Sequence, residues 1–510
     1  MAKRIYEEYF GAESVDTENK AANTILNRWQ YRVLQILTSS NPSEITPDSL
    51  EGKLLSENYK PIADEDQGAA NMNASKPSQE DIEKFIGNMK QKGFVDENNG
   101  PNFDERFNIR QPIKFPKLSG PRGGFLELTK ACNLDCITCY NEFTRAQSRK
   151  MLPPDKQREV LDQFASFGAS WIALTGGETT LAPVWFELAK HAKDKGMAVR
   201  VYTCGIYPER EETLKQLIEL NPAEIRLTYA GMHATNDMAR PRKKSKKGTF
   251  DEITHTVEEL VKDGQPVKLN YILAHENLVE VESFIRFVYR LSQKYSKPIP
   301  INIGPLRIYG KASMPNRFTA PTAEDFMYVN NLIRGYRNMC SMEISVVFDC
   351  AEKLDEVILQ EKRAKMSNTP WPYLHQGCSF GRNAINIAYD GTVNICGIMG
   401  DKLTDNVISI INEEPEFYQQ FEITPESLKS NEFTSVRQLS IEDIWYKSPL
   451  LSFFQFFYRK EQCEPCDKYR VQCMGICPGM ALADSGDLRI GDKGCFKHLL
   501  GESKCRTVLE

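Results

Sequence analysis

The sequence predicts an α/β protein built on a partial (β/α)6, TIM-like barrel. Short apolar runs and amphipathic helical stretches alternate regularly from residue 124 onward. The predicted strands are Phe125–Thr129, Trp171–Leu174, Ala198–Tyr202, Glu224–Thr228, Val267–Leu273 and Ile299–Ile303. The predicted helices between them are Asp155–Phe167, Val184–Lys195, Glu211–Leu220, Thr249–Asp263 and Leu278–Tyr295. Apolar strands that alternate with helices are typical of a parallel sheet covered by helices.

Length and composition indicate a multidomain globular protein. The chain has 510 residues, of which 41% are apolar, and this length predicts about two to four domains. The net charge of −5 argues against a nucleic-acid binder with a strongly basic face. We find no apolar signal-peptide core and no run of about 18 apolar residues, so we expect a cytoplasmic protein without a membrane partner. Fourteen cysteines in such a protein indicate metal ligands.

Residues 1–115 are predicted to form a separate, winged-helix-like domain. The segment Asn23–Leu37 carries apolar residues at nearly helical period. Ser78 is a suitable N-cap for a second helix that Gly93 can end, and Phe94–Val95 then begins a short strand. Modules of this outline bind DNA, or they bind peptides by adding a strand to a sheet edge. The second helix is not rich in arginine, which weakens the DNA hypothesis.

Three cysteines follow the first predicted barrel strand. Cys132, Cys136 and Cys139 have C-x3-C-x2-C spacing, and they fall at the C-terminal end of the strand, where barrels of this kind carry their chemistry. Three thiolates cannot complete a four-ligand zinc site, but they can hold three irons of a [4Fe–4S] cluster and leave the fourth iron open. A partial zinc site and a chance match are the alternatives.

A second motif, Gly176-Gly177-Glu178, ends the second predicted strand. Glycines let a backbone approach a ligand closely, and a carboxylate can accept hydrogen bonds from an ammonium group, although a simple tight turn would look the same. Together with the cysteine loop, in which Tyr140 follows the third cysteine, this motif resembles the radical S-adenosylmethionine (SAM) superfamily. The resemblance implies a [4Fe–4S] cluster on the cysteines, a SAM site that includes Tyr140, Gly176 and Gly177, and a role for Glu178 in holding the methionyl amino group.

The same resemblance suggests two further SAM contacts. Thr228, at the end of the fourth strand, would be a polar contact, and Arg240 would be a candidate for the SAM carboxylate. Tyr229 and Ala230 depart from the superfamily's usual pattern, and Thr228 could equally be a strand-end hydroxyl without a ligand. Cys204 is isolated in the sequence and is predicted to be a free, buried thiol.

Six basic residues lie between Arg240 and Lys247. A solvated loop is the simplest interpretation. The alternative is a lid that attracts or steers an acidic peptide by its charge.

The last third of the chain carries seven spaced cysteines that resemble the SPASM extension of radical SAM enzymes. The resemblance implies two auxiliary [4Fe–4S] clusters, and so three in total. Cys378, Cys396 and Cys477 would bind the first cluster, and Cys463, Cys466, Cys473 and Cys495 would bind the second. The first cluster then has an open iron or takes Cys350 as its fourth ligand. A zinc site on Cys463, Cys466, Cys473 and Cys477 is the alternative, and the long insertion Asp401–Leu451 departs from the usual pattern.

The order of these segments gives a domain prediction. We expect a recognition domain over residues 1–115, a radical SAM barrel over 116–340, and a bridging region with the SPASM iron–sulfur domain over 341–510. Placed before a radical SAM core, the first domain resembles the recognition element that grips the leader of a ribosomally made (RiPP) precursor peptide. A structural extension is the alternative.

The resemblance implies a peptide maturase. A 5′-deoxyadenosyl radical made from SAM would abstract hydrogen from a precursor peptide, which then forms a thioether, C–C or C–O crosslink or another oxidised product. The expected partners are the leader and core of that peptide and an electron donor such as flavodoxin or ferredoxin. One alternative is a SPASM dehydrogenase that acts on a small molecule or a protein side chain, but Gly397 stands where one such family has an Asp base. The other is an iron–sulfur electron carrier, which would not need the Gly-Gly-Glu motif.

Overall fold

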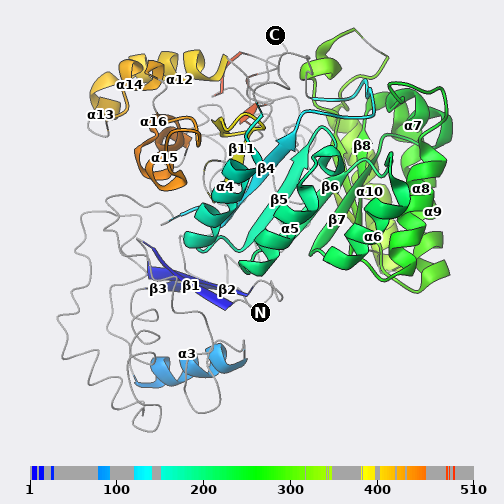
Figure 1. Cartoon of the computed structure of the whole chain (residues 1–510), viewed down its shortest axis with the longest axis horizontal. Coiled ribbons are helices and arrows are strands. Elements are labelled where there is room, and N and C mark those ends of the chain that lie inside the picture. The colour runs from blue at the N-terminus through cyan, green and yellow to red at the C-terminus, as the bar shows by residue number, and fades with distance from the viewer. Residues whose placement is uncertain are drawn as a thin grey trace.

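A computed structural model places a nine-stranded sheet at the centre of the protein (Figure 1). The structure describes residues 3–8, 11–16, 24–27, 79–91, 120–140, 151–315, 317–340, 342, 344–346, 381, 383–396, 402–419, 422–430, 433–454, 478–479, 482 and 486–488.

All six predicted barrel strands are present. They are β4 (Gly123–Thr129), β5 (Trp171–Gly176), β6 (Ala198–Thr203), β7 (Glu224–Tyr229), β8 (Val267–Leu273) and β9 (Ile301–Pro305). They lie side by side in chain order, and every neighbouring pair is parallel. Every second residue of β8 is buried while those between are partly exposed, as expected for strands whose helix-facing and inner faces differ. The partial barrel is therefore confirmed.

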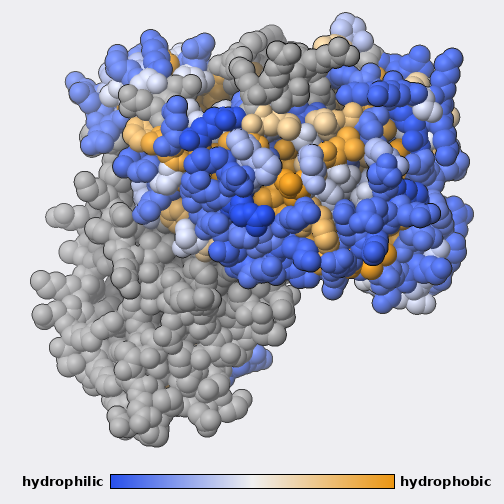
Figure 2. Space-filling model, viewed as in Figure 1, coloured by the Kyte–Doolittle hydropathy of each residue, from blue (hydrophilic) through white to orange (hydrophobic). Residues whose placement is uncertain are grey.

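The predicted helices cover the sheet as expected. They are α4 (Pro154–Ser166), α5 (Trp185–Asp194), α6 (Arg210–Leu220), α8 (Phe250–Lys262) and α9 (Val281–Tyr295). Left-handed residues end two of them, Asn221 after α6 (φ 42°) and Ser296 after α9 (φ 51°). The outer surface of these helices is mostly hydrophilic (Figure 2). None of the described helices is long and apolar enough to span a bilayer.

Several further elements were not predicted. They are η6 (Thr179–Leu181), α7 (His233–Ala239), η7 (His275–Glu280), η8 (Gly310–Ser313) and α10 (Ala323–Cys340). All five follow strands of the barrel, and the first four are seven residues or shorter. Elements as short as these four carry too few periodic positions to be recognised from the sequence.

Three further strands extend the sheet beyond the predicted barrel. β10 (Ile344–Val346) pairs in parallel with β9 at one edge. At the other edge β11 (Ala384–Ile387) pairs in parallel with β4, and β12 (Val393–Asn394) pairs antiparallel with β11. A strand from the predicted C-terminal domain therefore lies directly beside the strand that leads to the cysteine loop.

The predicted insertion Asp401–Leu451 is largely helical. It contains α12 (Lys402–Glu413), α13 (Pro415–Gln419), α14 (Pro425–Lys429), α15 (Ile441–Lys447) and α16 (Pro449–Ser452). The backbone N–H of Ile441, at the start of α15, donates a 2.6 Å hydrogen bond to the side chain of Gln163 on α4. The insertion is thus attached to the helical layer of the barrel.

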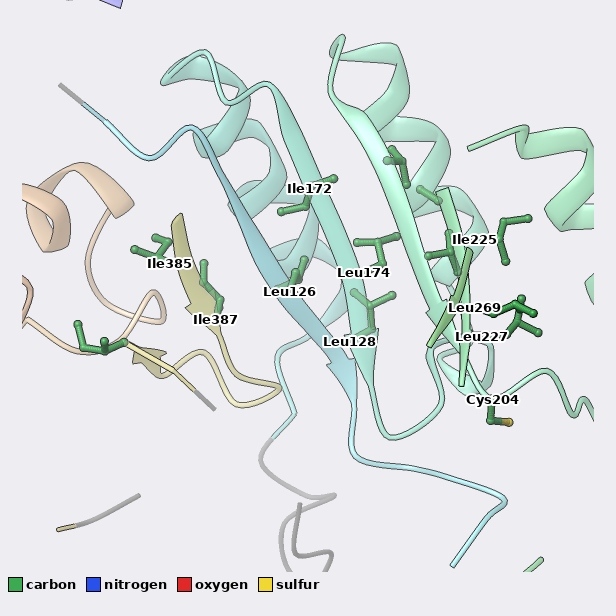
Figure 3. Close-up of a cluster of buried hydrophobic side chains, with 14 of the residues drawn as sticks. Leu126, Leu128, Ile172, Leu174, Cys204, Ile225, Leu227, Leu269, Ile385 and Ile387 are labelled. Carbon is green, nitrogen blue, oxygen red and sulfur yellow. The ribbon is translucent and has the colours of Figure 1, made fainter. Parts of the chain in front are cut away.

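A continuous apolar core fills the space around the sheet. Figure 3 shows Leu126 and Leu128 of β4 beside Ile172 and Leu174 of β5, and all four are at most 1% exposed. Ile385 and Ile387 of β11 belong to the same cluster. The strand beside β4 is therefore bound to the barrel by packing as well as by main-chain hydrogen bonds.

The N-terminal region differs from its prediction. A three-stranded antiparallel sheet, β1 (Lys3–Glu8), β2 (Gly11–Asp16) and β3 (Thr24–Asn27), opens the chain. The predicted first helix is wrong over 24–27, where apolar residues at β3 form a strand instead, because pairing with β2 overrides a periodic pattern. The second predicted helix is confirmed as α3 (Gln79–Gln91). The predicted strand at Phe94–Val95 lies outside the described residues.

Candidate active site

The cysteine loop leaves the C-terminal end of β4, as its position after the first strand predicted. Cys132, Cys136 and Cys139 are all partly buried, and the N–H of Cys139 donates a 3.3 Å hydrogen bond to the carbonyl of Cys136. Burial raises the pKa of the Cys132 thiol to about 12, although the N–H of Leu134 opposes the shift and the neighbouring Cys136 adds to it. A thiol with so high a pKa is neutral at pH 7 in the absence of metal, and metal binding would release its proton.

The two glycines of the Gly-Gly-Glu motif contact this loop. Gly176 has φ +147°, and a Cβ built there would lie 2.3 Å from the carbonyl oxygen of Thr129. A Cβ on Gly177 would lie 2.3 Å from the carbonyl oxygen of Ala131. The backbone N–H groups of Gly177 and Glu178 donate 2.7 Å hydrogen bonds to those same two carbonyls. Only glycine lets the end of β5 approach the loop so closely.

The Glu178 carboxylate is bonded to the chain itself. Its Oε1 accepts hydrogen bonds from the N–H and hydroxyl of Thr180 (3.1 and 2.8 Å) and from the hydroxyl of Thr203 (2.8 Å). Its Oε2 accepts a 2.6 Å bond from the N–H of Cys204. Glu178 is 1% exposed. These bonds join the ends of β5 and β6 beneath the cysteine loop.

Cys204 is buried, as predicted, but it is not isolated in space. Its Sγ lies 3.5 Å from Oδ1 of Asn133 and 3.4 Å from the carbonyl of Ile206. Asn133 in turn donates a 2.6 Å bond to that carbonyl. Burial raises the pKa of the Cys204 thiol well above its ordinary value, and negative charge at Glu178 adds to the shift. The neutral thiol therefore helps to fix the residue that follows the first cysteine.

The segment Ala239–Lys243, which begins at the last residue of α7, runs antiparallel to the cysteine loop. Backbone N–H groups of Asp135 and Ile137 donate to the carbonyls of Pro241 (2.7 Å) and Ala239 (2.9 Å), and the N–H of Lys243 donates to Asn133 (3.1 Å). From η8, the N–H of Ala312 donates a 3.1 Å hydrogen bond to the carbonyl of Cys139. The loop is thus held from several directions by main-chain contacts.

Arg240 is brought to the cysteines by this pairing. The residue is 5% exposed, and its Nη1 is buried without a hydrogen-bond partner among the described residues. Burial opposes its charge, but Cys136, Cys204 and Cys132 more than compensate, so the pKa of Arg240 is raised. A buried cation beside thiols stabilises negative charge at the site.

These residues fit a [4Fe–4S] cluster held through three irons. Three thiols share one loop, and a buried guanidinium compensates their charge. Within the described part of the chain, no three His, Cys, Asp or Glu side chains are arranged to hold a single metal ion. A cluster takes one thiolate per iron, so its cysteines need not converge on one point.

Thr228, another predicted SAM contact, also lies at this end of the barrel. Thr228 of β7 is partly exposed and pairs in register with Asn270 of β8. The side-chain amide of Asn302, on β9, donates a 3.1 Å hydrogen bond to Oδ1 of Asn270. The sequence analysis missed both asparagines, although their alternation with buried residues along β8 and β9 was a usable signal. They make a row of polar side chains on the inner face of the sheet.

Tyr140 follows the third cysteine. The residue as a whole is 40% exposed, whereas its pKa is that of a hydroxyl in a buried environment. Burial raises the pKa of Tyr140, and negative charge at Glu127, Cys139 and Cys396 adds to the shift. Cys396, which follows β12, therefore lies within electrostatic reach of the cysteine loop.

The remaining predicted iron ligands, Cys350, Cys378, Cys463, Cys466, Cys473, Cys477 and Cys495, lie outside the described residues.

Comparison with known proteins agrees with this geometry. Residues 126–288 match the Radical SAM superfamily model. Fe-coproporphyrin III synthase of Methanosarcina barkeri is 29% identical over 154 residues, which are 30% of this chain and only 37% of that protein. PqqA peptide cyclase of Rhizobium meliloti is 22% identical over 396 residues, 78% of this chain and 91% of that protein.

Among solved structures, Streptococcus suis SuiB bound to the precursor peptide SuiA matches with a TM-score of 0.63 and 14% identity. That match covers 99% of this chain and 98% of SuiB, and at this identity it shows a shared fold. The cysteine loop, the Gly-Gly-Glu turn against it and the superfamily match together show that this chain carries a radical SAM domain over residues 126–288.

Proposed function

We propose that this protein is a peptide maturase that abstracts hydrogen from a ribosomally made precursor peptide and so forms a crosslink or another oxidised product. The observation that carries the proposal is the extent of the likeness. It runs well beyond residues 126–288, over 78% of this chain for a peptide cyclase and 99% for an enzyme with its precursor peptide bound.

In this proposal Cys132, Cys136 and Cys139 hold the catalytic [4Fe–4S] cluster. The cluster and SAM together supply the radical chemistry, which a side-chain base could not perform on an unactivated C–H bond. The chain's own contribution is to bind SAM, to place the peptide's C–H group and to exclude water. We assign SAM contacts to the backbone of Gly176 and Gly177, to Tyr140 and to Thr228.

Arg240 and Glu178 have different parts in this proposal. Arg240 is buried beside Cys136, and its Nη1 has no hydrogen-bond partner among the described residues. Its guanidinium can therefore meet the SAM carboxylate while it stabilises the negative charge of the thiolates. The Glu178 carboxylate already accepts four hydrogen bonds from the chain. We therefore propose that it acts on the methionyl amino group mainly by fixing the turn at Gly177, with direct contact as the alternative.

We further propose two auxiliary [4Fe–4S] clusters in a SPASM domain over residues 341–510, following the barrel over 116–340. The first would use Cys378, Cys396 and Cys477, with Cys350 or an open position as the fourth ligand. The second would use Cys463, Cys466, Cys473 and Cys495. The cysteine spacing supports this assignment.

Residues 1–115 would bind the leader of the precursor peptide. In the described part of this region the three strands are ordered β1-β2-β3, so β1 and β3 have only one partner each. Such an edge can accept an extended peptide as an additional strand through main-chain hydrogen bonds. A flavodoxin or ferredoxin would supply the electrons.

The decisive experiment is incubation of the cluster-loaded enzyme with SAM, a reductant and short peptides encoded beside its gene. A crosslinking maturase should produce 5′-deoxyadenosine and a peptide that has lost two hydrogen atoms, with the new bond located by tandem mass spectrometry. Turnover of a small molecule or of a folded protein's side chain, with every candidate peptide left unchanged, would favour the dehydrogenase alternative instead.

A further inference from the structure

An exposed basic loop lies directly outside the cysteine loop. It consists of Lys243, Lys244, Lys246 and Lys247, which are all exposed. The chain as a whole has a net charge of −5. These four lysines therefore form a local concentration of positive charge, which attracts a negatively charged partner.

The backbone joins this loop to the proposed cluster ligands. The N–H of Lys243 donates to the carbonyl of Asn133, next to Cys132, and the carbonyl of Pro241 accepts from Asp135, next to Cys136. The lysines are thus only a few residues from main chain that covers two of the three cysteines. A partner seated on them would lie close to the cluster.

Both ends of the basic loop are fixed. Before it, Arg242 makes an ion pair with Glu252. After it, Oδ1 of Asp237 accepts 2.7 Å bonds from the N–H groups of Thr249 and Phe250. A Cβ at Gly248 would lie 2.3 Å from the Asp237 carboxylate, so the chain passes this carboxylate at close range. These contacts favour a fixed docking surface over a lid that closes.

We propose that the basic loop is the docking surface for an acidic one-electron donor protein with a flavin or iron–sulfur group. This inference rests on the proposed function. One electron leaves the reduced donor and enters the cluster held by Cys132, Cys136 and Cys139, and no bond is made or broken in that transfer. Exposed lysines suit this task because they speed encounter by long-range attraction without a rigid fit.

The location favours a donor over an acidic substrate peptide. A donor needs only to come near the cluster from outside, which the lysines on the solvent side of residues 239–243 provide. The peptide's reacting carbon must instead reach the inner face of the sheet, near Thr228 and Asn270. A peptide that binds the basic loop is nevertheless one outcome that the test distinguishes.

The test compares two charge reversals in the full-length, cluster-loaded enzyme. The variant is Lys244→Glu/Lys246→Glu, and its matched control is Lys215→Glu/Lys262→Glu, on exposed positions of α6 and α8. Stopped-flow absorbance follows reduction of the clusters by a reduced flavodoxin and, separately, by the methyl viologen radical cation. Viologen needs no docking surface, and its rate is measured at high salt so that the introduced glutamates do not attract this cation. The ratio of the two rates cancels any change in cluster potential. Flavodoxin affinity is measured in parallel.

In the variant, the ratio of flavodoxin to viologen rates should fall roughly tenfold to a hundredfold at low salt. The flavodoxin rate should depend less on salt concentration than in the parent, and the affinity for flavodoxin should be lower. The control should match the parent. An unchanged ratio would overturn the proposal. If the variant also bound the precursor peptide more weakly, the loop would belong to the substrate site instead. If the parent accepts electrons from flavodoxin but modifies no peptide, the proposed function fails while the docking result stands.

Discussion

The carboxylate of Glu178 accepts a 2.6 Å hydrogen bond from the backbone N–H of Cys204, and it thereby joins the ends of two neighbouring barrel strands under the cysteine loop. The same carboxylate accepts from Thr203 and Thr180. A group so placed can influence SAM binding without touching SAM.

Glu178→Ala should weaken SAM binding about tenfold or more, because it removes the four hydrogen bonds by which this carboxylate fixes the turn at Gly177. One hydrogen bond to a charged group is worth about 1.5–3 kcal/mol. It should also lower the free energy of unfolding, since the N–H of Cys204 loses its partner. Calorimetric SAM titration and denaturant unfolding measure the two effects. Thr203→Val distinguishes the two roles of Glu178. If Glu178 acts by position, Thr203→Val also weakens SAM binding, whereas a direct contact would leave SAM affinity at the parent value.

Gly177→Ala should reduce the iron bound at the catalytic site. A Cβ there would lie 2.3 Å from the carbonyl oxygen of Ala131, so the backbone just before Cys132 must move. Gly335→Ala on α10 is the control, because no atom lies within 4 Å of its added Cβ and alanine should stabilise that helix by roughly 0.5–1 kcal/mol. Iron content after anaerobic reconstitution is the measurement. Full occupancy in Gly177→Ala would show that the loop tolerates the shift.

The parent should bind roughly twelve irons per chain, four for each of three proposed clusters. Cys136→Ala should lower this to roughly eight and abolish SAM cleavage, since only the catalytic cluster loses a ligand. Iron analysis and 5′-deoxyadenosine assay test both statements. A parent with four irons and stoichiometric zinc would refute the auxiliary clusters, and continued SAM cleavage in Cys136→Ala would place the catalytic cluster elsewhere.

His275 should titrate above its ordinary pKa. Its Nδ1 lies 2.8 Å from Oδ2 of Asp325, and that hydrogen bond, with the charge of Asp325, raises the pKa of His275. Because the folded pKa is the higher one, the stabilisation is fully present below the unfolded pKa and is lost as pH rises through the folded value. NMR titration of labelled histidine measures the shift. Asp325→Asn should return the pKa of His275 to its ordinary range, and an unchanged value would exclude Asp325 as the cause.

Deletion of residues 1–115 should spare uncoupled SAM cleavage but strongly reduce modification of the full-length precursor. Every proposed SAM and cluster ligand lies beyond residue 130, whereas a tethered leader would hold the core peptide near the barrel at about millimolar effective concentration. Product analysis by mass spectrometry checks this. Adding the deleted domain in trans should restore activity only in part. Modification at the parent rate would mean that the domain does not recognise the leader.

The sequence was informative where chemistry or periodicity was strong. The six barrel strands and the cysteine loop after β4 could be predicted, because apolar runs of this length and thiols at this spacing each occur in few kinds of structure. The strand at Thr24–Asn27 was mistaken for helix, since its apolar residues fit either period. The bonds from Glu178 to Thr203 and Cys204 join residues that are distant in the chain, and no local pattern records them.

The pairing of β11 with β4 also has a consequence for biosynthesis. Ribosomes synthesise the chain at about 5–20 residues per second, so β4 and its cysteine loop emerge well before Ala384–Ile387. Until then β4 is the unpaired edge of a parallel sheet, and such edges invite association with other chains. A nascent chain that stalls before residue 384 should therefore aggregate, and the barrel reaches its final form only after most of the protein has been made.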